Sequence, residues 1–413
     1  MNRLRIGYVV QRYGVEVNGG SETHCRGLAE RLARNNDVDV LTTRAIDYVT
    51  WKDEYPEGAE TINGVCVRRF GVDQPRMPAQ FDAASQTVFL KPHTEADALR
   101  WMELQGPYST PLLTYLKQNR SAYDVFLFQT YLYATTYFGL PLVADRAVLI
   151  PTAHDELPIY LDIFDTVFRK ARHLLCLTPE ELAFLRRRFF DIDLKGDVLG
   201  SGIDPIPDPS PDPRWEALRE RLGNSPFILY VGRIDESKGC RILIEFFERY
   251  LAEFPGTDLQ LLMVGKAVMP ASGHPRIVLS GFVPEATKYW AIRECRFMVA
   301  PSPYESLCIA ALEAWLLGKP VLVNGDCAVL RGQCIRSNGG LWYTSYGEFR
   351  EAVNCLLNND ALACALGVQG EAFVRANYAW EEVDKCLMGV LSSIAATQAG
   401  SRDQSACLEP SSV

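Results

Sequence analysis

Two cations flank a short loop that the sequence places between a strand and a helix. Gly232, Arg233 and Lys238 lie between the apolar run 227–231 and the helical stretch 239–254. Positive charge at a helix N-terminus is unfavourable, because the helix dipole is itself positive there. A dianionic diphosphate would remove that conflict, and a guanidinium group suits phosphate well. We therefore predict a phosphate site here, with solvated surface charge as the alternative.

Two glutamates stand eight residues apart downstream. Glu305 follows the strand 297–300, and Glu313 lies in a predicted helix, 308–317, that is otherwise apolar. A carboxylate among apolar side chains costs energy unless hydrogen-bond donors reach it. Ribose hydroxyls are suitable donors, so Glu313 is a candidate ligand-binding residue; a buried structural glutamate is the alternative. The preceding residues, 306–308, are expected to form the first helical turn, with free backbone N–H groups.

Two weaker signals lie in the first half of the chain. His154 comes directly after the strand 147–152, where side chains face the ligand-binding edge of the sheet; taken alone, a structural histidine is the better explanation. Gly19 and Gly20, followed by Ser21 and Glu22, connect the first strand to the first helix. Glycines there permit a close backbone approach to an anionic ligand. The spacing is not the G-x-G-x-x-G of nicotinamide-binding proteins, and a plain tight turn is the alternative.

Alternating strands and helices must position these residues. In the first half, strands are expected at 4–10, 38–42, 65–70, 125–129 and 147–152, with a helix over 21–34 and a less regular insertion over 73–120. The second half repeats the pattern, with strands at 227–231, 259–264, 297–300 and 320–323 and helices over 239–254, 308–317, 347–357 and 360–375. Such alternation predicts doubly wound parallel sheets, whose ligands bind beyond the carboxyl ends of the strands.

Proline content marks the boundary between the halves. Residues 204–213 contain five prolines, which excludes a helix interior or a central strand. The predicted organisation is a Rossmann-like first domain over 1–200, a linker over 201–214 and a second Rossmann-like domain over 215–378. A C-terminal helix over 379–396 should pack back toward the first domain. The Ser-rich segment 397–413 is expected to be disordered.

Composition excludes several functions. The 413 residues carry a net charge of −9 and neither half is basic, so nucleic-acid binding lacks its electrostatic basis. The 12 cysteines include no C-x-x-C pair, which argues against a zinc ribbon or a thioredoxin-type site. No signal peptide and no apolar run of membrane-spanning length is recognised. We expect a cytoplasmic protein, with at most a weak peripheral contact to the inner face of the membrane.

Taken in register, these elements resemble the retaining GT-B glycosyltransferases of family four. The resemblance covers most of the chain and is strongest over 226–326. It rests on the glycine pair with Glu22, on His154, on the loop from Gly232 to Gly239, on Gly281-Phe282-Val283 and on the E-x7-E motif from Glu305 to Glu313. Any single element is weak, but five in order are specific. The implied fold is GT-B, two doubly wound Rossmann-like domains that face a cleft.

The resemblance implies a role for each matching residue. Arg233 and Lys238 would neutralise the donor diphosphate, Glu313 would bind the ribose, and Glu305 would face the donor sugar. His154 would contact the transferred sugar. The remaining donor-binding candidates are Gly19, Gly20, Gly232, Ser306, Leu307, Cys308 and Ile309. Many family members have glycine at the position of Cys308, which makes its backbone role less secure, and Arg331 is a candidate for reading donor or acceptor.

The implied reaction is sugar transfer from a UDP- or GDP-sugar to a saccharide or lipid-linked acceptor, as in polysaccharide or glycoconjugate biosynthesis. Fixed cations and helix N-termini would stabilise the departing diphosphate, so no metal ion or other cofactor is expected, and the sequence has no Asp-x-Asp motif to hold one. Domain closure would exclude water. The alternatives are an inverting transferase or an epimerase of the same shape, and a non-catalytic nucleotide-sugar-binding protein.

Overall fold

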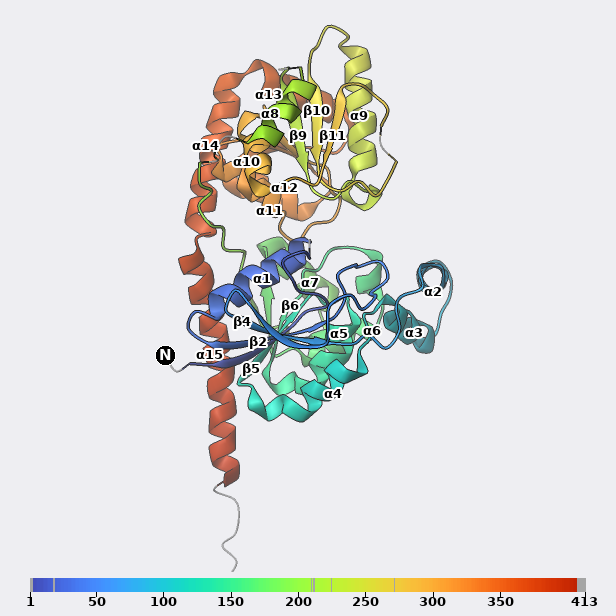
Figure 1. Cartoon of the computed structure of the whole chain (residues 1–413), viewed down its shortest axis with the longest axis vertical. Coiled ribbons are helices and arrows are strands. Elements are labelled where there is room, and N and C mark those ends of the chain that lie inside the picture. Colours follow the sequence, from blue (N-terminus) through green and yellow to red (C-terminus); the bar gives the residue numbers. More distant parts are fainter. Residues whose placement is uncertain are drawn as a thin grey trace, which may run out of the picture. The chain divides into compact units, whose positions relative to one another are not determined.

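The chain folds as two compact α/β units. The computed structural model describes residues 3–17, 19–208, 210, 212–223, 225–270 and 272–406. Unit 1 contains the described residues of 1–200 together with those from Val383 onward, and unit 2 contains those of 201–382 (Figure 1).

The described part of unit 1 is built on an eight-stranded sheet of order β3-β4-β2-β1-β5-β6-β7-β8. All neighbours are parallel except β3 and β4. The strands are β1 (Arg5–Val9), β2 (Asp37–Thr43), β3 (Gly58–Ile62), β4 (Val65–Phe70), β5 (Val125–Gln129), β6 (Ala147–Ile150), β7 (His173–Cys176) and β8 (Gly196–Val198).

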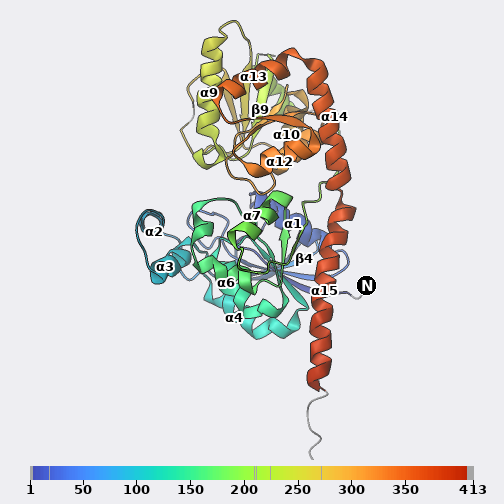
Figure 2. The ribbon, with the colours of Figure 1, turned by 180° about the vertical axis from the view of Figure 1, so that it is seen from behind.

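Helices cover both faces of this sheet. One face buries a core with α2 to α7, and the other lies against α1 and α15 (Figure 2). Arg31 of α1 bonds Asp384 of α15 at 2.8 Å, and Leu387 and Leu391 of α15 are buried. The helices are α1 (Gly20–Leu32), α2 (Pro78–Leu90), α3 (Glu95–Gln105), α4 (Thr110–Asn119), α5 (Ala134–Gly139), α6 (Ile163–Lys170), α7 (Pro179–Arg188) and α15 (Trp380–Ala406).

The described part of unit 2 has a six-stranded, fully parallel sheet of order β11-β10-β9-β12-β13-β14. Helices α9 and α13 share a buried core with one face of the sheet. The strands are β9 (Phe227–Val231), β10 (Gln260–Val264), β11 (Ile277–Gly281), β12 (Met298–Ala300), β13 (Val321–Asn324) and β14 (Gly340–Tyr343). The helices are α8 (Pro213–Arg221), α9 (Cys240–Glu253), α10 (Glu285–Glu294), α11 (Ile309–Leu316), α12 (Ala328–Ser337), α13 (Tyr346–Asn358) and α14 (Asp360–Asn377).

The two sheets confirm the predicted fold class of two doubly wound Rossmann-like units. In each sheet the strand order reverses beside the first strand of the unit, between β1 and β5 in unit 1 and between β9 and β12 in unit 2. Ligands of such sheets bind at this reversal, beyond the carboxyl ends of the strands. The loops after these four strands are therefore the places to look for chemistry.

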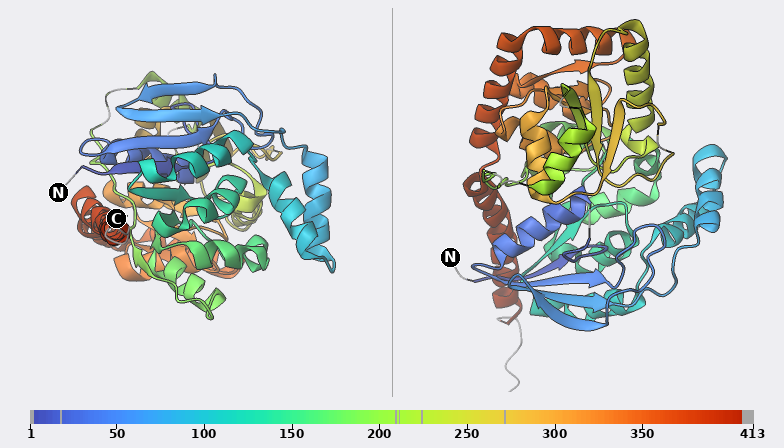
Figure 3. Two further views of the ribbon diagram at one scale, coloured as in Figure 1. Left: turned by 90° about the horizontal axis from the view of Figure 1, so that it is seen from below. Right: turned by 45° about the horizontal axis from the view of Figure 1, so that its top comes forward.

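Two regions differ from the sequence-based expectation. Residues 73–120, expected to be irregular, form the regular helices α2, α3 and α4; α2 and α3 project from the sheet as a hairpin (Figure 3). The two helices contact each other through Phe81 and Phe89 of α2, which lie beside Trp101 of α3. Helix α15 continues to Ala406, ten residues beyond the predicted end at 396; the disorder expected for the tail stays a prediction. Residues 407–413 lie outside the described residues.

Candidate active site

The loop after β9 is built to pass close to the loop after β12. Gly239 has φ +71°, and a Cβ atom there would lie 2.2 Å from the carbonyl oxygen of Pro301. Only glycine meets both conditions, because a side chain would be strained and would collide with backbone. At the other end of the loop, the Gly232 N–H donates to Val264 O at 3.0 Å, and the Tyr230 hydroxyl donates to Arg233 O at 2.6 Å.

The structure brings Lys238 and Glu305 together across these two loops. Lys238 Nζ lies 2.7 Å from Glu305 Oε1, and both side chains are partly buried. Burial alone would lower the pKa of Lys238, but the adjacent Glu305 carboxylate raises it above its usual value. Lys238 therefore remains a cation at physiological pH and holds the Glu305 side chain in a fixed place.

Arg233 occupies the same loop, and a residue that sequence reasoning missed binds its guanidinium group. Arg233 Nε donates to Asp235 Oδ2, and its side chain is 36 % exposed. Asp235 also accepts hydrogen bonds from the Lys238 backbone at 2.9 Å and from Ser237 Oγ at 2.6 Å. Burial favours a higher pKa for Asp235, but the hydrogen bond from Ser237 and the Arg233 charge lower it.

These pairs change the electrostatic argument made from the sequence. The cations Arg233 and Lys238 each have a carboxylate neighbour, Asp235 and Glu305 respectively. The positive charge in front of α9 is therefore already offset without a ligand. The conflict with the helix dipole is weaker than predicted, and a bound diphosphate would have to share these cations with the two carboxylates.

The segment after β12 departs from the expected helix start. α11 begins at Ile309, so Ser306, Leu307 and Cys308 are not its first turn. Cys308 is the N-cap residue and has φ +66°, a left-handed conformation that favours glycine. This explains physically why glycine suits the position. The first turn of the helix therefore starts at Ile309, and within it the Ala311 N–H already donates to Cys308 O at 3.1 Å.

Glu313 lies within α11 and is 9 % exposed. Lys288 Nζ of α10 donates to its Oε1 at 2.6 Å, so the donor that sequence reasoning sought is present within the unit. Burial raises the pKa of Glu313, and the Lys288 charge opposes that rise. Arg331, on α12, is exposed. Among the described residues, no hydrogen bond or ion pair found joins its side chain to Glu313 or Lys288.

In unit 1, Gly19 and Glu22 fit each other closely after β1. A Cβ atom on Gly19 would lie 2.2 Å from Glu22 Oε2, whereas one on Gly20 would meet nothing within 4 Å. Glu22 Oε1 accepts from Arg12 Nε at 2.7 Å and from Gln11 Nε2 at 2.9 Å. Arg12, which sequence reasoning missed, is thus held by Glu22 beside the glycine pair.

A chain of hydroxyl groups lies at the reversal point of the unit 1 sheet. Ser21 Oγ is 2.6 Å from Thr130 Oγ1, which accepts from Thr152 Oγ1 at 2.9 Å. Thr130, after β5, has φ +68°, and Thr152, after β6, has φ +47°. Positive φ is a genuine outlier for a β-branched residue, and such strain is concentrated at functional sites.

His154 follows Thr152 at the same edge and is partly exposed. Its Nδ1 lies 3.2 Å from Glu156 Oε1, so a carboxylate can orient the ring. The residue before it, Ala153, donates its N–H to the buried Glu181 carboxylate at 2.6 Å. His154 is thus placed beyond the carboxyl end of β6, as the sequence predicted.

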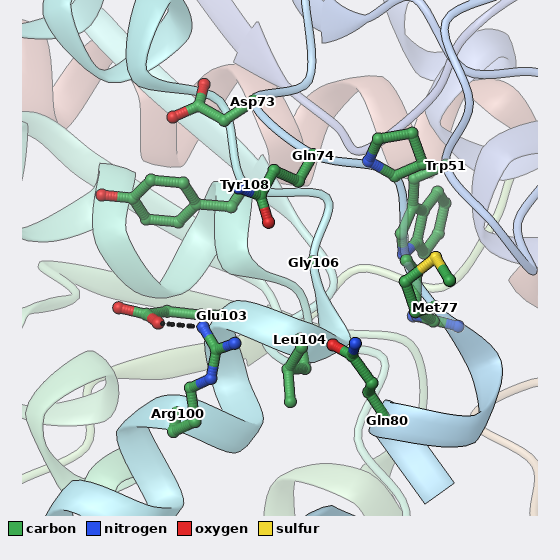
Figure 4. Close-up of a pocket in the computed structure, with 12 residues that line it drawn as sticks. Trp51, Asp73, Gln74, Met77, Gln80, Arg100, Glu103, Leu104, Gly106 and Tyr108 are labelled. Atoms are coloured by element: carbon green, nitrogen blue, oxygen red, sulfur yellow. Dashed lines mark hydrogen bonds and ion pairs between the residues drawn. The ribbon is translucent and has the colours of Figure 1, made fainter.

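Unit 1 also contains a pocket that sequence reasoning did not find. It has a volume of about 250 Å³ and lies beyond the carboxyl ends of β2 and β4, with one wall formed by the α2–α3 hairpin (Figure 4). Aromatic, amide and charged side chains surround it, namely Trp51, Asp73, Gln74, Arg76, Gln80, Arg100, Glu103 and Tyr108.

The described residues contain neither a metal-binding cluster nor a membrane-spanning helix. Nowhere in this part of the chain do three His, Cys, Asp or Glu side chains gather in a way that could hold a metal ion. Within the same residues, no helix has both the length and the hydropathy that crossing a bilayer would require.

The chain is similar to known proteins over most of its length. Residues 225–359 match the family model Glycosyl transferases group 1. An uncharacterized glycosyltransferase of Methanocaldococcus jannaschii is 25 % identical over 363 residues, which are 78 % of this chain and 80 % of that protein. Sucrose-phosphate synthase of Thermosynechococcus elongatus has a TM-score of 0.66 at 19 % identity, covering 98 % of this chain and all of that one. Anabaena HepE in complex with UDP-glucose also scores 0.66, at 15 % identity over 95 % of this chain and all of that one.

Proposed function

Since residues 225–359 are a Glycosyl transferases group 1 domain and the chain is a glycosyltransferase of the GT-B fold, we propose that it is a hexosyltransferase that uses a nucleotide-diphosphate sugar. The proposed donor is a UDP- or GDP-sugar, and the proposed acceptor is a saccharide or a lipid-linked saccharide. The anomeric configuration is retained and no metal ion takes part. The compartment we propose is the cytoplasm, with a weak contact to the membrane surface.

The observation that carries this proposal is the juxtaposition of Lys238 with Glu305 at the reversal point of the unit 2 sheet, 2.7 Å apart. Arg233 belongs to the same loop, and Glu313 is buried on the helix that follows Glu305. Two cations, an adjacent helix start and a second carboxylate are the groups needed to hold a diphosphate, a sugar and a ribose. HepE, a structural neighbour, has been crystallised with UDP-glucose.

In the proposed reaction, the bond between the sugar C1 and the diphosphate oxygen breaks, and its electron pair stays on the diphosphate. Arg233 and Lys238 stabilise the charge that develops there. The acceptor hydroxyl attacks C1 from the same face and gives its proton to the departing diphosphate oxygen. Glu305 and His154 contact the transferred sugar, and Glu313 binds the ribose. On the acceptor side, the loops beyond the unit 1 strands, including those that line the 250 Å³ pocket, offer polar and aromatic contacts.

A thermal-shift panel of nucleotide sugars tests the binding part of the proposal. A donor that binds only the folded protein stabilises it by about 2.7 kcal/mol at about 100 times its Kd. We predict that a UDP- or GDP-sugar raises the Tm of the wild-type protein and that Arg233→Ala and Lys238→Ala abolish the rise. Arg375→Ala removes a cation from an exposed position on α14 and should leave the rise unchanged.

Unchanged shifts in both site variants would refute the assigned roles. A normal shift in the wild-type protein, with neither sugar transfer nor donor hydrolysis, would identify a non-catalytic binding protein of the same fold.

A further inference from the structure

A buried carboxylate ties the His154 loop to the neighbouring strand of unit 1. Glu181, in the first turn of α7, is 1 % exposed. Its Oε1 accepts the N–H of Ala153 and its Oε2 accepts the N–H of Leu177, both at 2.6 Å. Ala153 follows β6 and Leu177 follows β7, so one side chain joins the carboxyl ends of two strands.

This arrangement differs from ordinary helix capping. Thr178 is the N-cap residue of α7, and its hydroxyl accepts the N–H of Glu181. A glutamate at this third helical position commonly bonds back to the N-cap N–H. Glu181 instead reaches past the cap to Leu177 and across to the residue before His154.

The energetics argue that this carboxylate does more than stabilise the fold. None of the ion pairs found among the described residues includes Glu181, and burial raises its pKa to about 7, although the two backbone N–H groups oppose that rise. An ionised carboxylate in such a place is expensive, and apolar side chains could fill the same space at lower cost. The backbone it holds is itself strained, because Thr152 has φ +47°.

We propose that Glu181 is a positioning residue for His154: by accepting the Ala153 N–H it holds the strained turn at Thr152 and so fixes where the imidazole stands. This inference rests on the proposed function, in which His154 contacts the transferred sugar. Glu181 itself touches neither donor nor acceptor.

The two hydrogen bonds that Glu181 accepts, from the N–H groups of Ala153 and Leu177, form a clamp whose strength should depend on pH. The titratable groups that interact with Glu181 are His154 after β6 and Cys176 on β7. The ionised carboxylate accepts both N–H bonds, whereas the protonated group keeps only one strong acceptor oxygen. Because the pKa of Glu181 is higher in the folded state than in the unfolded state, the folded state binds more protons between about pH 4.5 and 7, and stability falls as pH rises through that window. The clamp is therefore complete above about pH 7, where its contribution to stability is least favourable.

The test compares Glu181→Gln, His154→Ala and the double variant by steady-state kinetics with the donor found in the thermal-shift panel. Gln keeps one acceptor oxygen and turns an amide N–H2 group toward the other N–H. We expect Glu181→Gln to lower kcat about 10- to 100-fold with little change in the KM for the donor, because small misplacements of a catalytic group have effects of this size. The double variant should be no slower than His154→Ala within about twofold. Between pH 5 and pH 7.5, Glu181 should make the Tm of the wild-type protein fall as pH rises. In Glu181→Gln this contribution to the fall should be absent.

Asp39→Asn is the matched control. Asp39 is a buried carboxylate of β2 that accepts the Tyr123 hydroxyl at 2.6 Å, far along the sheet from the His154 loop. The Asp39→Asn substitution should lower Tm without lowering kcat. In the double variant with His154→Ala, the effects of the two substitutions should add. Glu181→Asp, which keeps the charge on a shorter side chain, serves if the Gln variant does not fold, and should lower kcat by a smaller factor.

Additive effects of Glu181→Gln and His154→Ala, or an unchanged kcat in Glu181→Gln, would overturn the positioning role while leaving the proposed function intact. If His154→Ala itself transfers sugar at the wild-type rate, the role assigned to His154 fails instead, and the inference fails with it.

Discussion

The charged side chains of the unit 2 site form pairs, and the sequence analysis named both partners of only one pair, Lys238 with Glu305. Lys288, which binds Glu313, is 25 positions away in the chain, and Lys238 and Glu305 are 67 apart. Long-range pairs of this kind leave no local pattern. The cations, the two glutamates and His154 could be picked out because each follows a strand or interrupts an apolar helix. Lys288 lies inside α10 and has no such signal. Asp235 does follow β9, but it stands three residues before Lys238, where it has the pattern of an ordinary cap.

Cys308 gives a prediction at the same scale. Its φ of +66° strains any side chain, so Cys308→Gly should relieve about 1 kcal/mol of backbone strain. The lost burial of a small side chain is of similar size. We therefore expect Cys308→Gly to unfold within a few degrees of the wild-type Tm and to keep turnover. Cys308→Val adds a β-branched side chain and should be clearly destabilised. A Gly variant that unfolds earlier than the Val variant would contradict this reading of the turn.

Elements with a clear apolar or alternating run were predictable, and several elements without one were missed. The sequence located β4, β5 and β9 with their observed bounds, because each is an apolar or alternating run with clear limits. It missed β7, β8 and β14, which have only three or four residues, β3, an exposed antiparallel edge strand, and β11, the edge strand of the unit 2 sheet. Such strands are too short for periodicity to show and take their conformation from the neighbouring strand. The carboxyl-end loops were nevertheless placed correctly, because each site loop follows a strand that was found.

Gly239 tests how these elements hold the site together. Gly239→Ala would place a Cβ atom 2.2 Å from Pro301 O at φ +71°, so α9 or the loop after β12 must move. We expect a loss of about 2 kcal/mol or more in the free energy of unfolding and a smaller donor-induced rise in Tm. Gly389→Ala is the control, since a Cβ atom there meets nothing within 4 Å in α15 and should stabilise by about 0.5–1 kcal/mol. Urea unfolding of both variants measures the difference, and equal stabilities would show that the two loops are not in close contact.

Across the whole molecule, the two sheets share one plan. Both reverse their strand order beside the first strand of the unit. Gly19 in unit 1 and Arg233, Lys238 and Glu305 in unit 2 follow strands at the reversal, and His154 follows β6, the strand next to β5. The likeness to sucrose-phosphate synthase over 98 % of the chain extends to the whole fold rather than to one unit. A fold of this kind serves several chemistries, so the residues at the reversal points, and not the fold, decide the reaction.

The most direct measurement is the anomeric configuration of the transferred sugar. The stabilising donor is incubated with an acceptor panel of mono- and disaccharides in excess EDTA, and the product is examined by proton NMR through the coupling constant of its anomeric hydrogen. Transfer that leaves the donor configuration unchanged, proceeds with EDTA present and is lost in Lys238→Ala is the expected result. A product of inverted configuration, or transfer that stops when EDTA is added and resumes with a divalent cation, would contradict metal-independent retention at the Lys238–Glu305 site.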